Sequence, residues 1–247
     1  MKSASDYIVF PLDVPDPDQA RDLVRLLAHE VGMFKIGLEL FIRSGPDLVR
    51  WAASAGRARI FLDLKLHDIP ATVNRAMKRI ADLGVFLATV HCGDSQAMLS
   101  AAVDGAAGNV NVLGVTVLTS VSPADVAAAG YEKRYAAHLP ELVLKKAAMA
   151  KEAGCDGVVC SGEEVRWVKE KFGPSFMAVT PGIRPASAAV SGDDQSRVVT
   201  PAMAIQQGAD YLVIGRPIRD AADPVAAARS IAAEIQEVLE ERMKDEG

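Results

Sequence analysis

Charged residues interrupt an apolar run at positions 59–70, and their types and spacing could do chemistry. Asp63 and Lys65 stand two residues apart in a segment otherwise rich in apolar side chains. In an extended strand this spacing places both side chains on the same face. A carboxylate and an ammonium are costly to bury unless they are paired, so the pattern predicts either a structural ion pair or a reacting pair. The segment alone leaves both interpretations open, because structural ion pairs perturb pKa values as catalytic ones do.

The elements that must position this pair alternate along the whole chain, with short apolar segments followed by longer segments of helical period. The eight predicted strands are Tyr7–Val14, Met33–Leu40, Arg59–Leu66, Phe86–Cys92, Asn111–Leu118, Gly157–Ser161, Phe176–Ile183 and Tyr211–Ile218. The eight predicted helices are Asp16–Val31, Gly45–Ala55, Ala71–Leu83, Ser95–Ala106, Pro140–Ala153, Glu163–Phe172, Thr200–Gln207 and Asp223–Glu241. The chain has 247 residues, and no Pro/Ser-rich linker divides it. We therefore predict one α/β domain over residues 1–247, a (β/α)8 TIM barrel, in preference to an open doubly wound sheet.

A barrel of this kind carries its active site at the carboxyl ends of the strands, so polar residues at those ends are candidates. The candidates are Asp13, Lys35, Asp63, Lys65, Asp68, His91, Thr119 and the segments 180–184 and 215–217. Phosphate sites in this fold commonly lie after the seventh and eighth strands, where Gly182 and Gly215 fall.

Taken singly, several candidates have simpler explanations. Asp13 is typical of a turn before Pro15, and Lys35 is typical of a strand charge that faces solvent. His91 is interpreted as a hydrogen-bonded histidine of the core or rim, because no carboxylate or second histidine stands at the spacing of a metal site.

The composition argues against several classes of partner. A formal net charge of -5 and a pI of about 5.4 predict neither a nucleic-acid surface nor an acidic-membrane surface. Cys92, Cys155 and Cys160 lack metal-ligand spacing, so they are expected as free thiols in a reducing cytosol. No apolar run approaches membrane-spanning length, and the run at 7–12 is too short for a signal peptide. We therefore expect a cytoplasmic protein.

Seven short motifs extend from the first predicted strand to the last. They are Leu12-Asp13-Val14, Phe34-Lys35-Ile36-Gly37, Asp63-Leu64-Lys65-Leu66-His67-Asp68-Ile69-Pro70-Ala71-Thr72, Thr116-Val117-Leu118-Thr119-Ser120, Thr180-Pro181-Gly182-Ile183-Arg184, Gly192-Asp193-Asp194-Gln195 and Ile214-Gly215-Arg216-Pro217. In this order the set closely resembles the orotidine 5′-monophosphate decarboxylase family. The resemblance implies a barrel enzyme that converts orotidine 5′-monophosphate into uridine 5′-monophosphate in pyrimidine biosynthesis, with no metal or organic cofactor.

The resemblance also implies roles for individual residues. The catalytic residues would be Lys35, Asp63, Lys65 and Asp68. The substrate-binding residues would be Asp13, Lys35, Ile69, Thr72, Thr119, Pro181, Arg184, Gln195, Gly215 and Arg216. Lys65 would donate the proton that replaces CO₂. Asp68, Ile69 and Thr72 would enter the active site of the other subunit of a homodimer.

The remaining substrate-binding residues would divide between the parts of the nucleotide. By the same resemblance, Asp13 and Lys35 would contact the ribose, and Thr119 or Ser120 would recognise the pyrimidine. Arg184, Gln195, Gly215 and Arg216 would hold the 5′-phosphate, and the segment 181–195 would close over it.

Two rival functions remain at this stage. Metal-dependent relatives such as 3-keto-gulonate-phosphate decarboxylase and hexulose-phosphate synthase share the Asp-x-Lys-x-x-Asp core. They carry a metal-binding glutamate near the end of the second strand, where this sequence has Lys35, and a cation does not replace a cation ligand. A catalytically silent barrel that binds nucleotides is the other rival. Charged residues at the four catalytic positions argue against a barrel without catalytic activity.

Overall fold

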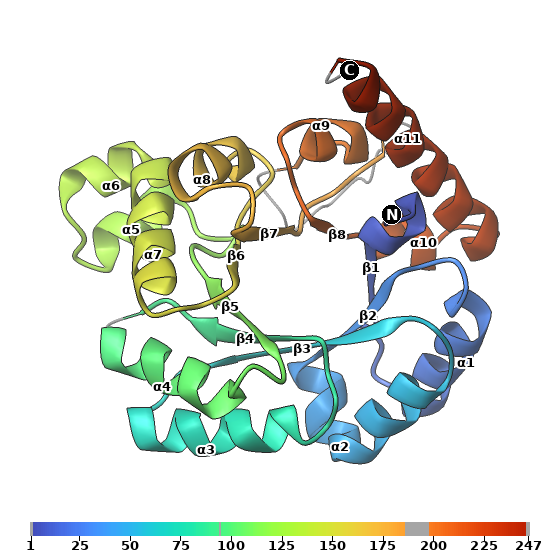
Figure 1. The fold of residues 1–247 in the computed structure, drawn as a ribbon, viewed down its shortest axis with the longest axis horizontal. Coiled ribbons are helices and arrows are strands. Elements are labelled where there is room, and N and C mark those ends of the chain that lie inside the picture. The colour runs from blue at the N-terminus through green and yellow to red at the C-terminus, as the bar shows by residue number, and fades with distance from the viewer. Residues whose placement is uncertain (1, 94, 186–197, 246–247) are drawn as a thin grey trace.

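Eight parallel strands close into a barrel in the computed structural model of the protein, with each strand bonded to the next and β8 bonded to β1 (Figure 1). The structure describes residues 2–93, 95–185 and 198–245. The strands are β1 (Ile8–Pro11), β2 (Met33–Gly37), β3 (Arg59–Leu66), β4 (Leu87–His91), β5 (Asn111–Val115), β6 (Gly157–Val159), β7 (Met177–Thr180) and β8 (Tyr211–Val213). The predicted (β/α)8 barrel is therefore confirmed.

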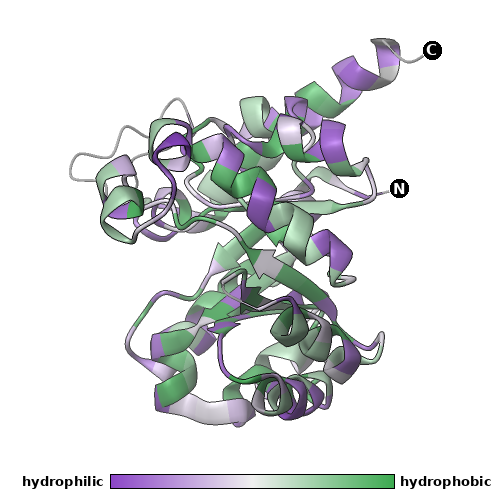
Figure 2. Cartoon of the chain, turned by 90° about the vertical axis from the view of Figure 1, so that its left-hand side faces the viewer, coloured by the Kyte–Doolittle hydropathy of each residue, from purple (hydrophilic) through white to green (hydrophobic). Residues whose placement is uncertain are grey.

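Helices surround the strands and connect them in chain order (Figure 1). The main connecting helices are α1 (Pro17–Leu27), α2 (Leu38–Ser54), α3 (Pro70–Ala81), α4 (Gln96–Ala106), α7 (Leu139–Glu152), α8 (Val165–Phe172), α9 (Pro201–Gln206) and α11 (Pro224–Asp245). Figure 2 shows the strands coloured mainly as hydrophobic and the outer helices carrying hydrophilic segments. This pattern follows from the parallel sheet, because helices cover its outer face and side chains fill its interior.

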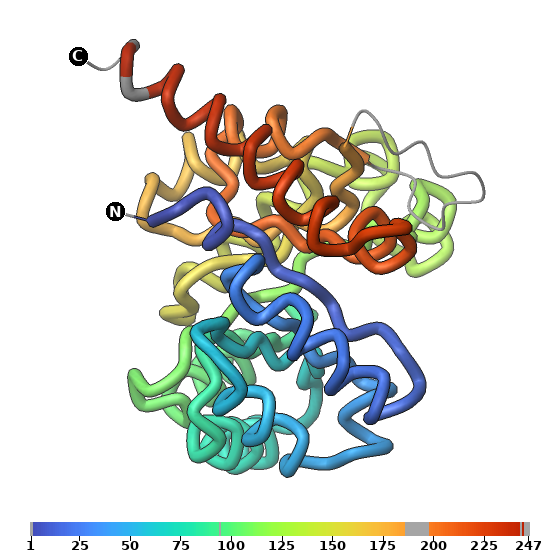
Figure 3. Tube along the Cα trace, turned by 90° about the vertical axis from the view of Figure 1, so that its right-hand side faces the viewer, coloured from blue at the N-terminus to red at the C-terminus, as the bar shows by residue number. Residues whose placement is uncertain are grey.

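Two buried clusters form the core. The smaller one fills the barrel interior with side chains from β1 to β5, β7 and β8, namely Val9, Met33, Phe61, Leu87, Leu113, Val179 and Tyr211. The larger one lies between the strands and the helices, and it includes Phe10, Phe34 and Leu62. The short helix η1 (Ala4–Tyr7) packs against α11, so the two ends of the chain lie close together (Figure 3). The core thus holds the strands rigidly beneath the site.

The strand β3 has the predicted bounds, Arg59–Leu66, whereas the other seven strands end earlier than the sequence predicts. Strand structure was expected to continue through Leu40, but β2 ends at Gly37 and Leu40 lies buried in α2. Likewise β8 ends at Val213, and Ile218 is buried in the short helix α10 (Arg216–Arg219). Apolar residues beyond a strand still face the core, so hydrophobicity alone does not mark where the strand ends.

The helix predicted over Gly45–Ala55 is preceded by a helical segment that was not predicted. Residues from Leu38 to Ser54 form α2, which is interrupted at Gly45 by the non-helical values φ 63° and ψ -164°. A positive φ is cheap only for glycine, so Gly45 separates two helical segments, and the second agrees with the predicted helix.

Three short helices were not predicted: α5 (Pro123–Ala128), α6 (Lys133–Ala137) and α10. The Ser122 and Asp125 side chains form a capping box at the start of α5, a signal that the sequence did contain.

Candidate active site

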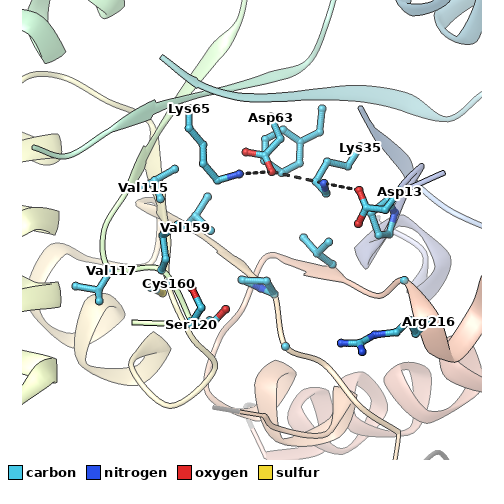
Figure 4. Close-up of a pocket in the computed structure, with 18 of the residues that line it drawn as sticks. Asp13, Lys35, Asp63, Lys65, Val115, Val117, Ser120, Val159, Cys160 and Arg216 are labelled. Atoms are coloured by element: carbon cyan, nitrogen blue, oxygen red, sulfur yellow. Dashed lines mark hydrogen bonds and ion pairs between the residues drawn. The ribbon is translucent and has the colours of Figure 1, made fainter. Parts of the chain in front are cut away.

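A cavity of about 630 Å³ opens at the carboxyl ends of the strands (Figure 4). Its lining residues are Pro11, Asp13, Lys35, Phe61, Asp63, Lys65, Val115, Val117, Leu118, Thr119, Ser120, Val159, Cys160, Pro181, Gly182, Arg184, Val213, Gly215, Arg216 and Arg219. The cavity therefore gathers nine of the predicted site residues in one place: Asp13, Lys35, Asp63, Lys65, Thr119, Pro181, Arg184, Gly215 and Arg216.

Four of these residues form a row of alternating charge along one wall (Figure 4). Lys35 Nζ lies 3.2 Å from Asp13 Oδ1 and 3.6 Å from Asp63 Oδ2. On the other side of Asp63, Lys65 Nζ donates to Oδ2 at 2.9 Å. The row comes from β2 and β3 and from the turn after β1, which lie next to one another in the barrel. Neighbouring strands thus bring together charges that are distant in sequence.

Lys65 reaches the cavity through a bulge in β3. Leu62 pairs with Ala88 and Leu66 with Val90, so four steps along β3 match two steps along β4. Within this bulge Lys65 adopts φ 51°, in the left-handed region that non-glycine residues rarely occupy. The extended geometry expected from strand period is therefore wrong at Lys65, although its side chain still meets Asp63. Strained backbone of this kind is typical of functional positions.

Asp63 is held as an anion although it is buried. Its residue is 8% exposed. Burial raises the pKa of this carboxyl, but Lys35 and Lys65 and hydrogen bonds from Lys65 and Thr89 outweigh burial, so the pKa is lowered. A buried carboxylate with a lowered pKa beside two ammonium groups is ionised at neutral pH. The row therefore presents fixed charges to whatever fills the cavity.

The opposite side of the cavity carries cations on the loops after β7 and β8. Figure 4 shows Arg216 across the cavity from Lys65. A side chain at Gly215 would place its Cβ 2.9 Å from Pro11 Cγ, so the backbone approach requires glycine there. Arg184 N donates to Val199 O at 3.0 Å, which ties the chain after β7 to the segment before α9. Cations over exposed backbone after the last two strands are suited to an anion.

Sequence reasoning did not identify Arg219, Thr89 or Cys160 as site residues. Arg219 lines the cavity and donates from Nη1 to the backbone oxygen of Asp13 at 2.9 Å. It lies three residues after Arg216 on one helical turn, a spacing that could have indicated a shared face. Thr89 is buried beneath Asp63 and had no signal beyond its place in an apolar strand.

Asp68, Ile69 and Thr72 do not line the cavity of their own chain. They lie after β3 and at the start of α3, where Asp68 Oδ1 accepts the Ile69 N–H at 2.6 Å. Ile69 is 65% exposed, which is unusual for a large apolar residue. Gln195 lies outside the described residues. His91 is half-buried and stacks on His67 with ring centroids 5.9 Å apart, in agreement with its interpretation as a rim histidine.

Within the described ranges, no three His, Cys, Asp or Glu side chains are grouped so that they could hold a metal ion. Among the helices described, none combines the length and apolar character needed to cross a membrane.

The chain is similar to known proteins along most of its length. Residues 6–231 match the family model "Orotidine 5'-phosphate decarboxylase / HUMPS family". A protein of Desulfosudis oleivorans named orotidine 5'-phosphate decarboxylase is 56% identical over 239 residues, which cover 96% of each chain. One of the same name from Moorella thermoacetica is 47% identical and covers 95% of this chain and 94% of its own. The crystal structure of orotidine 5'-phosphate decarboxylase from Lactobacillus acidophilus has a TM-score of 0.77 and 37% identity, and it covers 92% of this chain and 98% of its own.

Proposed function

Because the chain belongs to the orotidine 5′-phosphate decarboxylase / HUMPS family, we propose that it is an orotidine 5′-phosphate decarboxylase. It removes the carboxylate from C6 of the pyrimidine and forms uridine 5′-monophosphate and CO₂. The observation that carries this proposal is the row Asp13, Lys35, Asp63, Lys65, with the Lys65 ammonium held 2.9 Å from Asp63.

The two sides of the cavity fit the two ends of such a nucleotide. The 5′-phosphate binds beside Gly215, Arg216 and Arg184, whereas Gln195, the fourth residue expected there, lies outside the described residues. Asp13 and Lys35 hold the ribose, and Thr119 or Ser120 hydrogen-bonds the base. The lining between them is apolar, including Val115, Val117 and Val159, so the base leaves water as it binds.

Lys65 carries the chemical step. The C6–CO₂ bond breaks with its electron pair left on C6, the Lys65 ammonium gives a proton to that carbon, and CO₂ departs. Lys65 is then reprotonated from solvent. A preorganised ammonium stabilises charge that develops in the transition state with little reorganisation. Because this positive charge and this proton come from the chain, the reaction needs no metal or organic cofactor.

Asp63 and Asp68 keep Lys65 charged and aimed at C6. Asp63 also borders the place where the substrate carboxylate sits, so it contributes positioning, electrostatic repulsion of that carboxylate, or both. The lowered pKa of Asp63 favours a role as a permanent anion.

The finer proposal concerns the assembly. We propose a homodimer in which Asp68, Ile69 and Thr72 of each chain complete the active site of the partner. Two observations support it: these residues do not line their own cavity, and Ile69 is exposed at 65% together with Ile42 at 79% and Leu38 at 50%. Exposed apolar residues of this kind favour a protein–protein contact. We further propose that the enzyme acts in the cytoplasm, which agrees with its three free cysteines.

The metal-dependent members of this superfamily are the nearest alternative. Their chemistry requires a carboxylate ligand near the end of the second strand, and in this chain that place is taken by the Lys35 ammonium, which already lies between Asp13 and Asp63. This arrangement disfavours a divalent cation there.

One assay distinguishes these functions. Purified protein is mixed with orotidine 5′-monophosphate, and the fall in pyrimidine absorbance is followed with and without a chelator. We expect decarboxylation that the chelator does not change. Activity abolished by the chelator would favour the metal-dependent class, and no activity would favour a silent barrel.

A further inference from the structure

A second cavity, of about 540 Å³, lies between the loop after β4, the loop joining α5 to α6, and α7. Its lining residues are Gly93, Ala129, Gly130, Tyr131, Leu142, Lys145, Lys146 and Met149. None of them lines the first cavity, and no role is assigned to any of them above. Figure 1 shows α5, α6 and α7 grouped on one side of the barrel with α4 next to them.

Lys146 is the unusual member of this cavity. It is 9% exposed, yet the lining residues within 2–93, 95–185 and 198–245 include no carboxylate. Within the part of the chain that the structure describes, its Nζ makes no ion pair, and its one aromatic contact is with the ring of Tyr131, 5.8 Å from the centroid. That distance is near the outer limit of a cation–π contact. Lys146 lines the cavity, and its Nζ is not among the fully buried polar atoms without a partner, so this ammonium is accessible to an anion that enters the cavity.

Two further features add positive potential at the same place. Lys145 lines the cavity beside Lys146. The N-terminus of α4 lies close by, because Gln96 Nε2 donates to the backbone oxygen of Met149 at 3.1 Å. The field also reaches His91, whose pKa is lowered by burial and then by the Lys146 charge. Two lysines and a helix N-terminus without a lining carboxylate form a site for an anion.

We propose that this cavity binds a phosphate group, either as inorganic phosphate or as a small phosphate monoester, between Lys145 and Lys146. A lysine ammonium binds phosphate as a point charge with three donors, and two of them match a dianion. At the rim, a side chain at Gly93 would place its Cβ 2.8 Å from His67 Nε2, so glycine allows the backbone and this ring to approach closely. The volume admits a group larger than phosphate alone.

Calorimetric titration of the purified protein with inorganic phosphate tests the proposal. We expect two phosphates per chain, one at the candidate active site and one at the second cavity. Lys146→Met should weaken the affinity for phosphate at the second cavity by about tenfold or more, the scale of a lost hydrogen bond to a charged group. Arg216→Ala should instead weaken only the affinity for phosphate at the candidate active site. Repeating the titration with ribose 5-phosphate distinguishes inorganic phosphate from a phosphate monoester as the ligand. The one that binds the second cavity more tightly is the preferred ligand.

Matched variants keep the test decisive. Lys146→Arg retains the charge and should retain the second phosphate, whereas Lys151→Met removes an exposed lysine of the same helix and should change nothing. Decarboxylation by Lys146→Met should stay within about twofold of the parent, so failure of this site is distinguishable from failure of the proposed function. A titration of Lys146→Met identical to that of the parent would overturn the proposal.

Discussion

Thr89 on β4 donates its hydroxyl to Asp63 Oδ1 on β3 at 2.9 Å, and its oxygen accepts the backbone N–H of Lys65 at 2.9 Å. One buried hydroxyl therefore fixes both members of the charged pair, the carboxylate through its side chain and the lysine through its backbone. The bulge that places Lys65 at φ 51° is supported by this contact from the neighbouring strand. The chemistry of β3 thus depends on a side chain of β4.

Thr89→Val tests this dependence, because valine preserves the shape and removes the hydroxyl. We expect kcat to fall by about tenfold to a hundredfold, since a hydrogen bond to a charged group contributes roughly 1.5–3 kcal/mol. KM should change less, because Thr89 does not line the cavity. Thr89→Ser is the matched control and should stay near the parent. Steady-state kinetics with an unchanged kcat for Thr89→Val would contradict the role.

Asp63 gives stability a dependence on pH. Its pKa in the folded protein is below its ordinary value of 3.8. The stability that its charge contributes is therefore fully present above that ordinary value and is lost as the pH falls through the lower folded value. We expect the difference in free energy of unfolding between the parent and Asp63→Asn to shrink between pH 5 and pH 2. Urea denaturation at a series of pH values measures it, and a difference that stays constant would count against a lowered pKa.

Shared active sites predict complementation between two inactive variants. In the proposed dimer, each active site takes Lys65 from one chain and Asp68 from the other. A dimer of one Lys65→Ala chain and one Asp68→Ala chain therefore contains one site with neither change. We expect each variant alone to be inactive and the mixture, after subunit exchange, to recover up to about a quarter of the parent activity per site. Exchange is checked with differently tagged chains. Proven exchange with no recovered activity would contradict the shared site.

Arg216 is expected to act on the phosphate of the substrate. Arg216→Ala should weaken binding of orotidine 5′-monophosphate by roughly 1.5–3 kcal/mol, the scale of a charge-assisted hydrogen bond. The same change should matter little for orotidine, which lacks the phosphate and should already be a very poor substrate. Steady-state kinetics of the parent and of Arg216→Ala, each with orotidine 5′-monophosphate and with orotidine, form a double cycle. Equal losses for the two substrates would show that Arg216 supports the fold or the base.

The barrel was predictable because alternating strands and helices leave a period in the sequence. The charged row was predictable only in part: Asp13 and Lys35, taken singly, were interpreted as a turn residue and a solvent-facing charge, but Lys35 lies between Asp13 and Asp63. The bulge at Lys65 was not predictable, since it arises from a mismatch with β4 that no single segment encodes. Thr89 was missed because a threonine inside an apolar strand resembles any β-branched core residue. The second cavity was missed for a related reason: Lys145 and Lys146 lie in an ordinary helical pattern, and the burial of Lys146 depends on the loop between α5 and α6 and on the loop after β4.

The most direct test of the proposed mechanism is turnover by Lys65→Ala. If the Lys65 ammonium supplies the proton and the charge at C6, this variant should lose about 10²–10⁴-fold or more in kcat, the range attributed to a general acid. It should still bind uridine 5′-monophosphate within about tenfold of the parent, because Arg216 and the walls of the cavity are unchanged. The measurement is the absorbance assay for kcat, paired with a calorimetric Kd for the product. Decarboxylation within tenfold of the parent would contradict the mechanism.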